Sequence, residues 1–276
     1  MQQLSRVLHR AGKTIGLVPT MGFLHEGHLS LVSRSRKVSD ITVVSIFVNP
    51  TQFGPNEDFS RYPRDLKRDK KLLAEAGVDY IFIPDAEELY QQGFQSYVNV
   101  AGITQILEGE FRPRHFMGVT TIVAMLFNIV NPDSAIFGQK DAQQAFIIQQ
   151  MVNDLKFSVK IVVIPVVREN DGLALSSRNI YLSEKEREDA LVLNHSLMYA
   201  RKVISGRRHD VNRIISGMKK IIERVQTSNL DYISIVDALT FSPVKKLEHG
   251  KKYYVLIACK IGNTRLIDNI LVKAAS

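Results

Sequence analysis

The stretch TIGLVPTMGFLHEGH, at residues 14–28, is the part of the chain that decides the expected fold. Residues 14–19 form a short apolar run, and a helical pattern begins at residue 26, with a turn containing Gly22 between them. An apolar strand that leads through such a turn into a helix is the basic unit of α/β domains. Ligands of open α/β sheets bind at the carboxyl ends of the strands, so this turn is also the first candidate site.

Four further apolar runs continue the pattern along the chain. They are rich in β-branched residues and lie at residues 41–48 (ITVVSIFV), 79–83 (DYIFI), 134–137 (SAIF) and 159–164 (VKIVVI). Continuous apolar strands suit a parallel sheet that is covered on both faces. Helical patterns lie between and after them, at residues 26–37, 64–76, 119–130 and 142–155. The alternation predicts a Rossmann-type, doubly wound parallel α/β sheet.

The pattern changes after Leu182. Ser183 and Glu186 form the signature of a capping box, which predicts a helix start. Two long helical stretches follow at residues 184–204 and 211–227, and strand-like runs come after them at residues 232–236, 253–260 and 265–270. We therefore expect two domains, a Rossmann-like domain over residues 1–182 and a smaller α+β domain over residues 183–276.

The composition of the chain is typical of soluble globular proteins, with 45% hydrophobic and 23% charged residues among 276. No apolar run reaches the ~18 residues of a membrane-spanning helix, and the first residues lack the pattern of a signal peptide. The single cysteine, Cys259, lies in an apolar run and is expected to be a buried thiol. These features predict a cytoplasmic protein that does not associate with membranes.

The formal net charge of +8 is concentrated in the last third of the chain. Residues 1–182 carry 19 Lys and Arg against 18 Asp and Glu, whereas residues 183–276 carry 17 against 10. A solvated basic surface is the plain interpretation, and attraction of anionic ligands or nucleic acid is the alternative. The basic stretch at residues 201–209 has no interleaved aromatic side chains for stacking on bases, so we expect no nucleic-acid partner.

The chain lacks both the P-loop and the G-x-G-x-x-G turn, so a nucleotide must be bound in another way. His25 and His28 lie three residues apart, and therefore on one face, at the start of the first helix of the α/β pattern. Backbone N–H groups and the helix dipole favour phosphate there. A zinc site is one alternative, although the metalloprotease motif spaces its histidines four apart and no other Cys/His cluster follows. Two unrelated surface histidines are the other alternative.

Polar side chains also follow the second expected strand, in FVNPTQF at residues 47–53. The amides of Asn49 and Gln52 can hydrogen-bond a small polar ligand, with aromatic side chains as the walls of a pocket. The alternative is a proline-directed turn with solvated amides.

Two more loops carry groups suited to a nucleotide. In FGQKDAQQ, residues 137–144, Lys140 can neutralise phosphate, Asp141 can accept from ribose hydroxyls and Gln144 lies one turn further on. In DGLALSSRN, residues 171–179, Arg178 is a fixed cation beside two serines. An ordinary helix start and a polar interdomain loop are the alternatives for these segments. Together the loops predict an anion-binding cleft for ATP beside a small polar substrate.

These motifs resemble those of the pantothenate synthetase family. PTMGFLHEGH at residues 19–28 is similar to the H-x-G-H signature of the nucleotidyltransferase superfamily in the form of that family. FVNPTQF, RYPR at residues 61–64, FGQKDAQQ and LALSSRN occur in the family's order, and YVLIACKIGNTRLIDNI at residues 254–270 resembles its C-terminal end. The resemblance covers almost the whole chain.

The resemblance implies a ligase that condenses pantoate with β-alanine to pantothenate, the vitamin B5 precursor of coenzyme A. The carboxylate of pantoate attacks ATP to give a pantoyl adenylate and pyrophosphate, and the amine of β-alanine then displaces AMP. Mg²⁺, a homodimer and a C-terminal domain that closes over the site as a lid are further implications.

The resemblance also implies roles for individual residues. The ATP-binding positions are Pro19, Thr20, Met21, Gly22, His25, Gly27, His28, Gly138, Lys140, Asp141, Val167, Leu175, Ser176, Ser177 and Arg178. Among them, the residues expected to stabilise developing charge are His25, His28, Lys140 and Arg178. The positions expected to bind pantoate are Met21, Asn49, Gln52, Tyr62 and Gln144, and Asp69 lies in the region that helps to hold Mg²⁺.

Two residues depart from the family pattern in RPRHFMGV, residues 112–119. Arg114 stands where the family has glycine, and Met117 stands where a charged residue is common. A glycine there can take a positive φ, which arginine disfavours.

Two other functions compete with this interpretation. A related adenylyltransferase with the same histidine turn releases pyrophosphate but stops at a stable adenylylated product, and Gln52 and Gln144 favour pantoate over its substrates. A nucleic-acid-binding module predicts salt-dependent binding to any duplex and leaves the N-terminal motifs unexplained.

Overall fold

The computed structural model describes residues 1–55, 57–206 and 210–275, and its contacts divide the chain into two compact units. Unit 1 comprises Met1–Gln139 and Gln143–Pro165, and unit 2 comprises Lys140–Ala142 and Val166–Ser276. Residues 166–182 therefore group with unit 2, whereas the sequence places a boundary near Leu182. The functional division into a substrate-binding domain over 1–182 and a lid over 183–276 stays a prediction.

Unit 1 contains a five-stranded, wholly parallel sheet in the order β3-β2-β1-β4-β5. The strands are β1 (Ile15–Thr20), β2 (Ile41–Ile46), β3 (Tyr80–Phe82), β4 (Ser134–Gly138) and β5 (Lys160–Ile164). Each lies within or at the edge of an apolar run identified from the sequence, so the doubly wound α/β fold is confirmed. The chain runs outward from β1 to β3 on one side and from β4 to β5 on the other. The carboxyl ends of β1 and β4 therefore form the switch point at which such sheets bind ligands.

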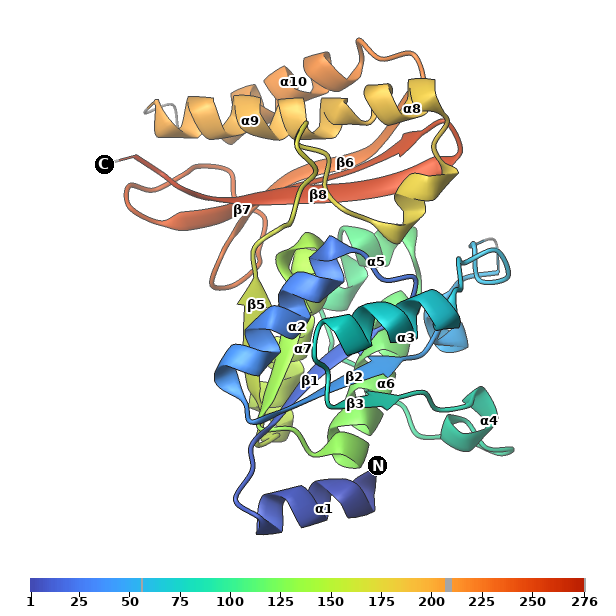
Figure 1. The fold of residues 1–276 in the computed structure, drawn as a ribbon. Coiled ribbons are helices and arrows are strands. Elements are labelled where there is room, and N and C mark those ends of the chain that lie inside the picture. Colours follow the sequence, from blue (N-terminus) through green and yellow to red (C-terminus); the bar gives the residue numbers. More distant parts are fainter. Residues whose placement is uncertain (56, 207–209, 276) are drawn as a thin grey trace. The chain divides into compact units, whose positions relative to one another are not determined.

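Helices cover both faces of this sheet (Figure 1). The helices of unit 1 are α1 (Gln2–Arg10), α2 (Glu26–Val38), α3 (Leu66–Glu75), α4 (Ala86–Leu89), α5 (Glu108–Phe111), α6 (His115–Val130) and α7 (Ala142–Leu155). Apolar residues of α2 and α3 share a core with one face of β1, β2 and β4, and those of α6 and α7 share a second core with the other face. Short 3₁₀ turns lie at η1 (Pro50–Gln52), η2 (Ile103–Gln105) and η3 (Gln139–Asp141).

Unit 2 is an antiparallel sheet in the order β6-β7-β8 that shares one core with two helices. Its elements are η4 (Ser177–Tyr181), α8 (Glu184–Asp189), α9 (Leu191–Ser205), α10 (Val211–Ile222), β6 (Ser228–Asp237), β7 (Lys252–Ile261) and β8 (Thr264–Lys273). The capping box of Ser183 and Glu186 is confirmed. The helix expected over 184–204 is interrupted at Ala190, and that expected over 211–227 ends at Ile222.

Cys259 is fully buried in β7, as expected, and burial raises the pKa of its thiol to about 11. It is therefore an unreactive core residue. Residues 207–209, the end of the basic stretch noted above, lie outside the described part of the chain.

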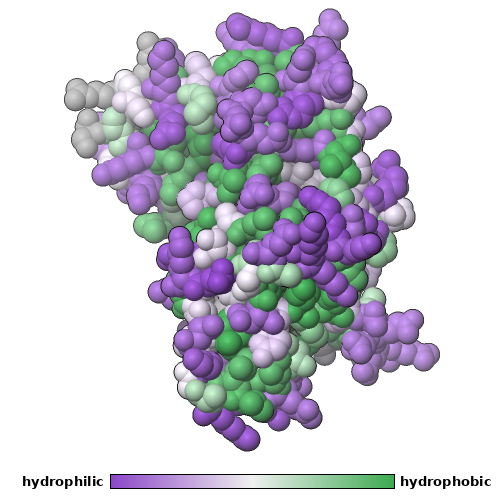
Figure 2. All heavy atoms as spheres, viewed as in Figure 1, coloured by the Kyte–Doolittle hydropathy of each residue, from purple (hydrophilic) through white to green (hydrophobic). Residues whose placement is uncertain are grey.

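Hydrophilic residues cover much of the face seen in Figure 2, with apolar areas among them. Within the described residues, no helix has both the length and the apolar character needed to cross a membrane.

Candidate active site

The turn after β1 is fixed by its own side chains. The Thr20 hydroxyl donates to the Ser45 carbonyl of the neighbouring strand over 2.7 Å and accepts the Gly22 N–H at 3.2 Å. Gly22 has a φ of 80° and packs against Ile46 and Asp69. A side chain at this position would be strained by the backbone and crowded by both neighbours. The glycine predicted to bind ATP is therefore also required by the turn.

The residue after Gly22 is held in an unfavourable backbone conformation. Phe23 has a φ of 49°, which is uncommon for a bulky residue. The Asp69 carboxylate accepts the N–H groups of Phe23 and Leu24 through its two oxygens, each at 2.8 Å. The Arg68 guanidinium lies over the Phe23 ring, 5.2 Å from its centroid. The start of α3 thus clamps the turn that carries the histidines.

His25 and His28 cap α2 reciprocally. Nδ1 of His25 accepts the Gly27 N–H at 3.1 Å, and Nδ1 of His28 accepts the His25 N–H at 3.3 Å. Because a backbone N–H can only donate, Nδ1 of each neutral ring is an acceptor and the ring proton lies on Nε2. The ring centroids are 4.1 Å apart. The capping box therefore places two rings, each with its proton on Nε2, at the amino end of a helix. N–H donors at a helix start favour the binding of an anion.

Asp69 does not fit as a direct Mg²⁺ ligand. Its side chain is 1% exposed, and both of its oxygens already accept backbone N–H groups. No group of three or more His, Cys, Asp or Glu residues suited to a metal ion occurs in residues 1–55, 57–206 and 210–275. Mg²⁺ in nucleotide sites is bound largely by phosphate oxygens and water, so a metal carried by ATP does not need Asp69.

Asn49 and Gln52, both buried, form one hydrogen-bonded unit beyond β2. Nδ2 of Asn49 donates to Oε1 of Gln52 at 3.3 Å and to the Gly118 carbonyl at 3.1 Å. Oδ1 of Asn49 accepts from Thr51 and from the Tyr90 hydroxyl, which lies at 2.9 Å. The polar atoms of Asn49 are thus occupied by hydrogen bonds within the protein, and one of these bonds orients Gln52. Nε2 of Gln52 donates to the sulfur of Met21 over 3.0 Å, which joins two of the predicted pantoate residues.

Tyr62 lies beside the same segment. It is buried, and its ring packs edge-on against Phe53 with 5.9 Å between the centroids. Tyr62 therefore packs against the residue that follows Gln52.

Three further residues, Glu57, Arg112 and His115, form a hydrogen-bonded group next to Gln52, and no role was predicted for them from the sequence. Arg112 makes a paired salt bridge to Glu57, at 2.9 and 2.7 Å, and donates to Nε2 of His115 at 3.1 Å. Nδ1 of His115 lies 2.8 Å from the Gln52 carbonyl and is the donor in that bond. Burial, followed by the Arg112 charge, lowers the pKa of His115 to about 4. The neutral imidazole thus links an ion pair to the backbone of Gln52.

Arg114 adopts the left-handed conformation, with φ 69° and ψ −8°, at the start of α6. Position 114 therefore has the left-handed backbone conformation that glycine favours, although the residue is arginine. Gly118, one turn into the helix, packs so closely on the backbone of Thr51 and Gln52 that a Cβ would lie 2.5 Å from the Thr51 oxygen. Arg114 therefore adds backbone strain at the start of α6.

The end of β4 leads through Gly138 and η3 into α7, which carries Gln144 in its first turn. Lys140 and Asp141 form an ion pair of 3.8 Å. Gln143, which was not singled out from the sequence, accepts the Glu108 N–H and donates to the carbonyls of Ile103 and Ile106. It fastens the segment before α5 to α7.

Val167 and Leu175 lie on a small hairpin in unit 2. The Leu175 N–H donates to the Val167 carbonyl at 3.0 Å, Arg168 bridges Ala174, and Gly172, with φ 98°, forms the turn. Ser176 follows as the cap of η4, where its hydroxyl accepts the Arg178 N–H at 3.3 Å. Ser177 is buried.

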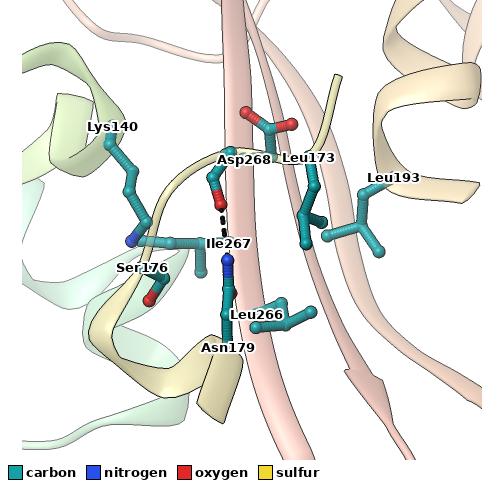
Figure 3. Close-up of a pocket in the computed structure, with 9 residues that line it drawn as sticks. Lys140, Leu173, Ser176, Asn179, Leu193, Leu266, Ile267 and Asp268 are labelled. Atoms are coloured by element: carbon teal, nitrogen blue, oxygen red, sulfur yellow. Dashed lines mark hydrogen bonds between the residues drawn. The ribbon is translucent and has the colours of Figure 1, made fainter. Parts of the chain in front are cut away.

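One pocket of unit 2 contains several of these residues (Figure 3). Its lining includes Lys140, Leu173, Ser176, Asn179, Ile267 and Asp268. The dashed line in Figure 3 marks the bond of 3.1 Å from the Asn179 amide to the Ala174 carbonyl. Lys140 and Ser176, far apart in sequence, are thus brought to one place.

The predicted site residues fall into two groups. Unit 1 holds Pro19, Thr20, Met21, Gly22, His25, Gly27, His28, Asn49, Gln52, Tyr62, Asp69, Gly138 and Gln144, and unit 2 holds Lys140, Asp141, Val167, Leu175, Ser176, Ser177 and Arg178. Within unit 1 the turn after β1 and the Gln52 segment meet through Met21, and within unit 2 Lys140 and Ser176 share a pocket.

Fold and turn together define a class: α/β nucleotide-binding enzymes with a His-x-Gly-His turn at the switch point of a parallel sheet. The chain belongs to the pantoate–β-alanine ligase family, whose model matches residues 1–271. It is 54% identical over 276 residues to the pantothenate synthetase of Acetivibrio thermocellus, with 99% of this chain and 96% of that protein covered.

Solved structures agree with the family assignment. A pantothenate synthetase from Thermus thermophilus matches with a TM-score of 0.90 and 45% identity over 96% of each chain. A pantoate–β-alanine ligase from Francisella tularensis, in complex with beta-gamma ATP and beta-alanine, matches with a TM-score of 0.78 and 35% identity over 98% of this chain and 94% of that one.

Proposed function

We propose that this chain joins pantoate to β-alanine with ATP, through a pantoyl adenylate, and releases AMP and pyrophosphate. Family membership over residues 1–271 supports this reaction. The observation that carries it at the level of chemistry is the reciprocal capping of His25 and His28, in which both Nδ1 atoms accept backbone N–H groups, so that each ring carries its proton on Nε2 at the helix start. We assign these donors to the phosphates of ATP.

The first step needs no protein nucleophile. A carboxylate oxygen of pantoate attacks the α-phosphorus of ATP, a new P–O bond forms, and the bond to the bridging oxygen breaks to release pyrophosphate. Negative charge grows on the leaving pyrophosphate, and donors that meet this charge lower the barrier. We assign this task to His25, His28, Lys140 and Arg178. Because the carboxylate is already nucleophilic, the remaining task of the protein is to position it.

We assign pantoate to the segment around Gln52. Gln52 is oriented by Asn49 and contacts Met21, and Tyr62 lies beside the segment. Asn49 acts through Gln52 in this proposal, because its own polar atoms are bound to Thr51, Tyr90 and Gly118. Gln144, in the first turn of α7, completes the predicted set.

In the second step the neutral amine of β-alanine attacks the acyl carbon of the adenylate. The C–N bond forms, the C–O bond to AMP breaks, and the ammonium formed loses a proton as the amide appears. Acyl adenylates react with water, so the site must exclude water during both steps. We propose that the residues of the predicted C-terminal domain serve as the lid.

Several finer features stay proposals. ATP arrives with Mg²⁺, and the charge of the metal would support departure of pyrophosphate, but no residue of the chain is assigned to it. A homodimer is proposed on the family resemblance, and a cytoplasmic location on the buried lone cysteine.

Pyrophosphate release from MgATP, measured with and without pantoate before β-alanine is added, tests the proposal. We expect release only with pantoate, in an amount near that of the enzyme, and AMP and pantothenate only after β-alanine. Folded protein that binds ATP but ignores pantoate would contradict the proposal and favour a related adenylyltransferase.

A further inference from the structure

Two polar residues are buried next to each other in strand β8 of unit 2. The exposed fractions of Asp268 and Asn269 are 4% and 2%. Burying a carboxylate is costly unless it is paired and hydrogen-bonded. The proposed chemistry assigns no role to either residue, so their partners indicate what they do.

Asp268 is bound to the hairpin that carries Val167 and Leu175. The Arg168 guanidinium donates to its two oxygens, at 2.7 and 2.9 Å. The same guanidinium donates to the Gly172 carbonyl at 2.9 Å and to the Asn269 carbonyl at 3.2 Å. One side chain therefore fixes the hairpin at its turn and ties it to β8.

Asn269 is bound to the other segment of the proposed site. Its Nδ2 donates to the backbone carbonyl of Lys140 at 3.0 Å. Lys140 lies 129 positions away in the sequence, so the bond ties the backbone of a distant segment to β8. Two adjacent residues of β8 thus hold two separate groups of proposed ATP-binding residues.

We infer that Asp268 and Asn269 are positioning residues that set Lys140 and the hairpin leading to Ser176 at a fixed spacing, so that their cations and donors meet the same phosphates. Both segments line one pocket together with Asp268 (Figure 3). Stabilisation of developing charge depends on placement, and an error of about 1 Å can cost about 100-fold in rate. This inference rests on the proposed function.

The same sheet offers a matched control. Arg265, also on β8, forms an ion pair of 2.6 Å with Asp231 on β6, and both side chains are partly buried. This pair joins two strands of unit 2 and includes none of the proposed ATP-binding residues. Loss of Asp231 is therefore expected to report the cost of breaking a partly buried pair in this sheet, away from the proposed ATP-binding residues.

The test compares Asp268→Asn, Asn269→Ala and Asp231→Asn with the unaltered protein. For each we would measure the melting temperature, ATP affinity by calorimetry, and kcat and KM for pantoate-dependent pyrophosphate release. We expect Asp268→Asn to lower kcat/KM for ATP about 100-fold and Asn269→Ala about 10-fold, while KM for pantoate stays within about twofold. Asp231→Asn should lower the melting temperature but leave kcat/KM within about twofold.

Equal losses in Asp231→Asn and Asp268→Asn at similar melting temperatures would overturn the inference, since they would show a purely structural effect. So would full activity in a folded Asp268→Asn. If that variant does not fold, Asn269→Ala decides alone, because it removes only a neutral side chain. If the unaltered protein binds ATP without turnover, the proposed reaction fails, and the ATP affinities of the variants still decide the positioning role. No ATP binding by the unaltered protein would overturn both.

Discussion

At the scale of single residues, the proposed reaction gives each of the two histidines one task at Nδ1, which caps the helix, and another at Nε2. Nδ1 of His28 caps α2 by accepting the His25 N–H, and the proposed reaction assigns the Nε2–H to the phosphates of ATP. An asparagine at this position can reproduce the acceptor but not the Nε2–H. The fold of the turn and the chemistry of the site therefore respond to different substitutions.

We predict that His28→Asn keeps the melting temperature within a few degrees and lowers kcat for pyrophosphate release by about 10²–10³, the cost of losing one donor to developing charge. His28→Gln, whose amide can reach the Nε2 position, should retain more activity. Steady-state kinetics and thermal unfolding of both variants check this. Equal kcat in the two variants would argue against a donor role for Nε2.

Asp69, predicted from the sequence to lie in the region that helps to hold Mg²⁺, holds the backbone of the turn after β1. Its two oxygens bind the N–H groups of Phe23 and Leu24, and Phe23 has a positive φ that needs such support. An asparagine supplies one acceptor oxygen and turns an NH₂ group toward the other N–H.

We predict that Asp69→Asn loses stability by about 2 kcal/mol, the scale of a buried charge-assisted hydrogen bond, and also weakens ATP binding. The Mg²⁺ concentration that gives half-maximal rate should not change. Thermal unfolding and a Mg²⁺ titration at saturating ATP measure these quantities. A large increase in the Mg²⁺ requirement with stability unchanged would restore Asp69 as a metal ligand.

At the scale of elements, α6 begins at a strained residue. Arg114 has φ 69°, in the left-handed region that favours glycine. A non-glycine residue in this region costs on the order of 1 kcal/mol. We predict that Arg114→Gly stabilises unit 1 by about 1 kcal/mol and that Arg114→Ala, which removes the same charge but keeps the strain, does not. Thermal unfolding of the two variants side by side checks this. A gain in stability in both variants would show that the loss of charge, and not the relief of strain, causes the effect.

The first turn of α6 is joined to η1 through a buried neutral histidine, which makes the fold sensitive to acid. The pKa of His115 is lowered to about 4, mainly by burial, from an ordinary value of 6.5. Between these values the unfolded chain binds more protons than the folded one, so stability falls as the pH falls from 6.5 toward 4.

The full effect of this histidine is about 3 kcal/mol, at 1.36 kcal/mol for each unit of pKa. We predict a melting temperature that falls through this window and falls less steeply in His115→Asn, whatever the absolute stability of that variant. Melting curves from pH 7 to pH 4 provide the measurement. Parallel pH profiles for the two proteins would refute the role of His115.

The elements predicted best from the sequence are the strands that have apolar surroundings on both faces of the sheet. Strands β1, β2, β4 and β5 have β-branched, apolar sequences because helices cover both faces of the sheet. The break at Ala190 was missed because α8 and α9 follow one another with only this residue between them, so the helical pattern does not lapse. Helices α4 and α5 have four residues each, too few for a periodic pattern.

At the scale of the whole molecule, the residues that support the site were harder to predict than those expected to touch ligands. The motifs are local in sequence, so Lys140 and Ser176 could be proposed from their segments. The bonds between Arg168 and Asp268 and between Asn269 and Lys140 span 100 and 129 positions. Single segments carry no sign of such partners, and only the folded unit joins them.

The uneven distribution of charge along the chain is also a property of the whole molecule. Residues 183–276 carry 17 Lys and Arg against 10 Asp and Glu, and ATP and pantoate are both anions. If this surplus draws substrates in, KM for both should rise with salt, because mobile ions screen attraction beyond about 8–10 Å at physiological ionic strength. Kinetics from low to moderate KCl, with circular dichroism as the control for folding, measure this. Unchanged KM values in folded protein would end the steering hypothesis.

The proposed reaction depends on attack of the pantoate carboxylate on the α-phosphorus of ATP. Pantoate labelled with ¹⁸O in both carboxylate oxygens tests it most directly, with mass spectrometry of the products after a single turnover. Attack by the carboxylate predicts one ¹⁸O atom in AMP, one in the amide carbonyl of pantothenate, and none in pyrophosphate. Unlabelled AMP, or label in inorganic phosphate together with ADP, would contradict the adenylate and point to a different activated acid.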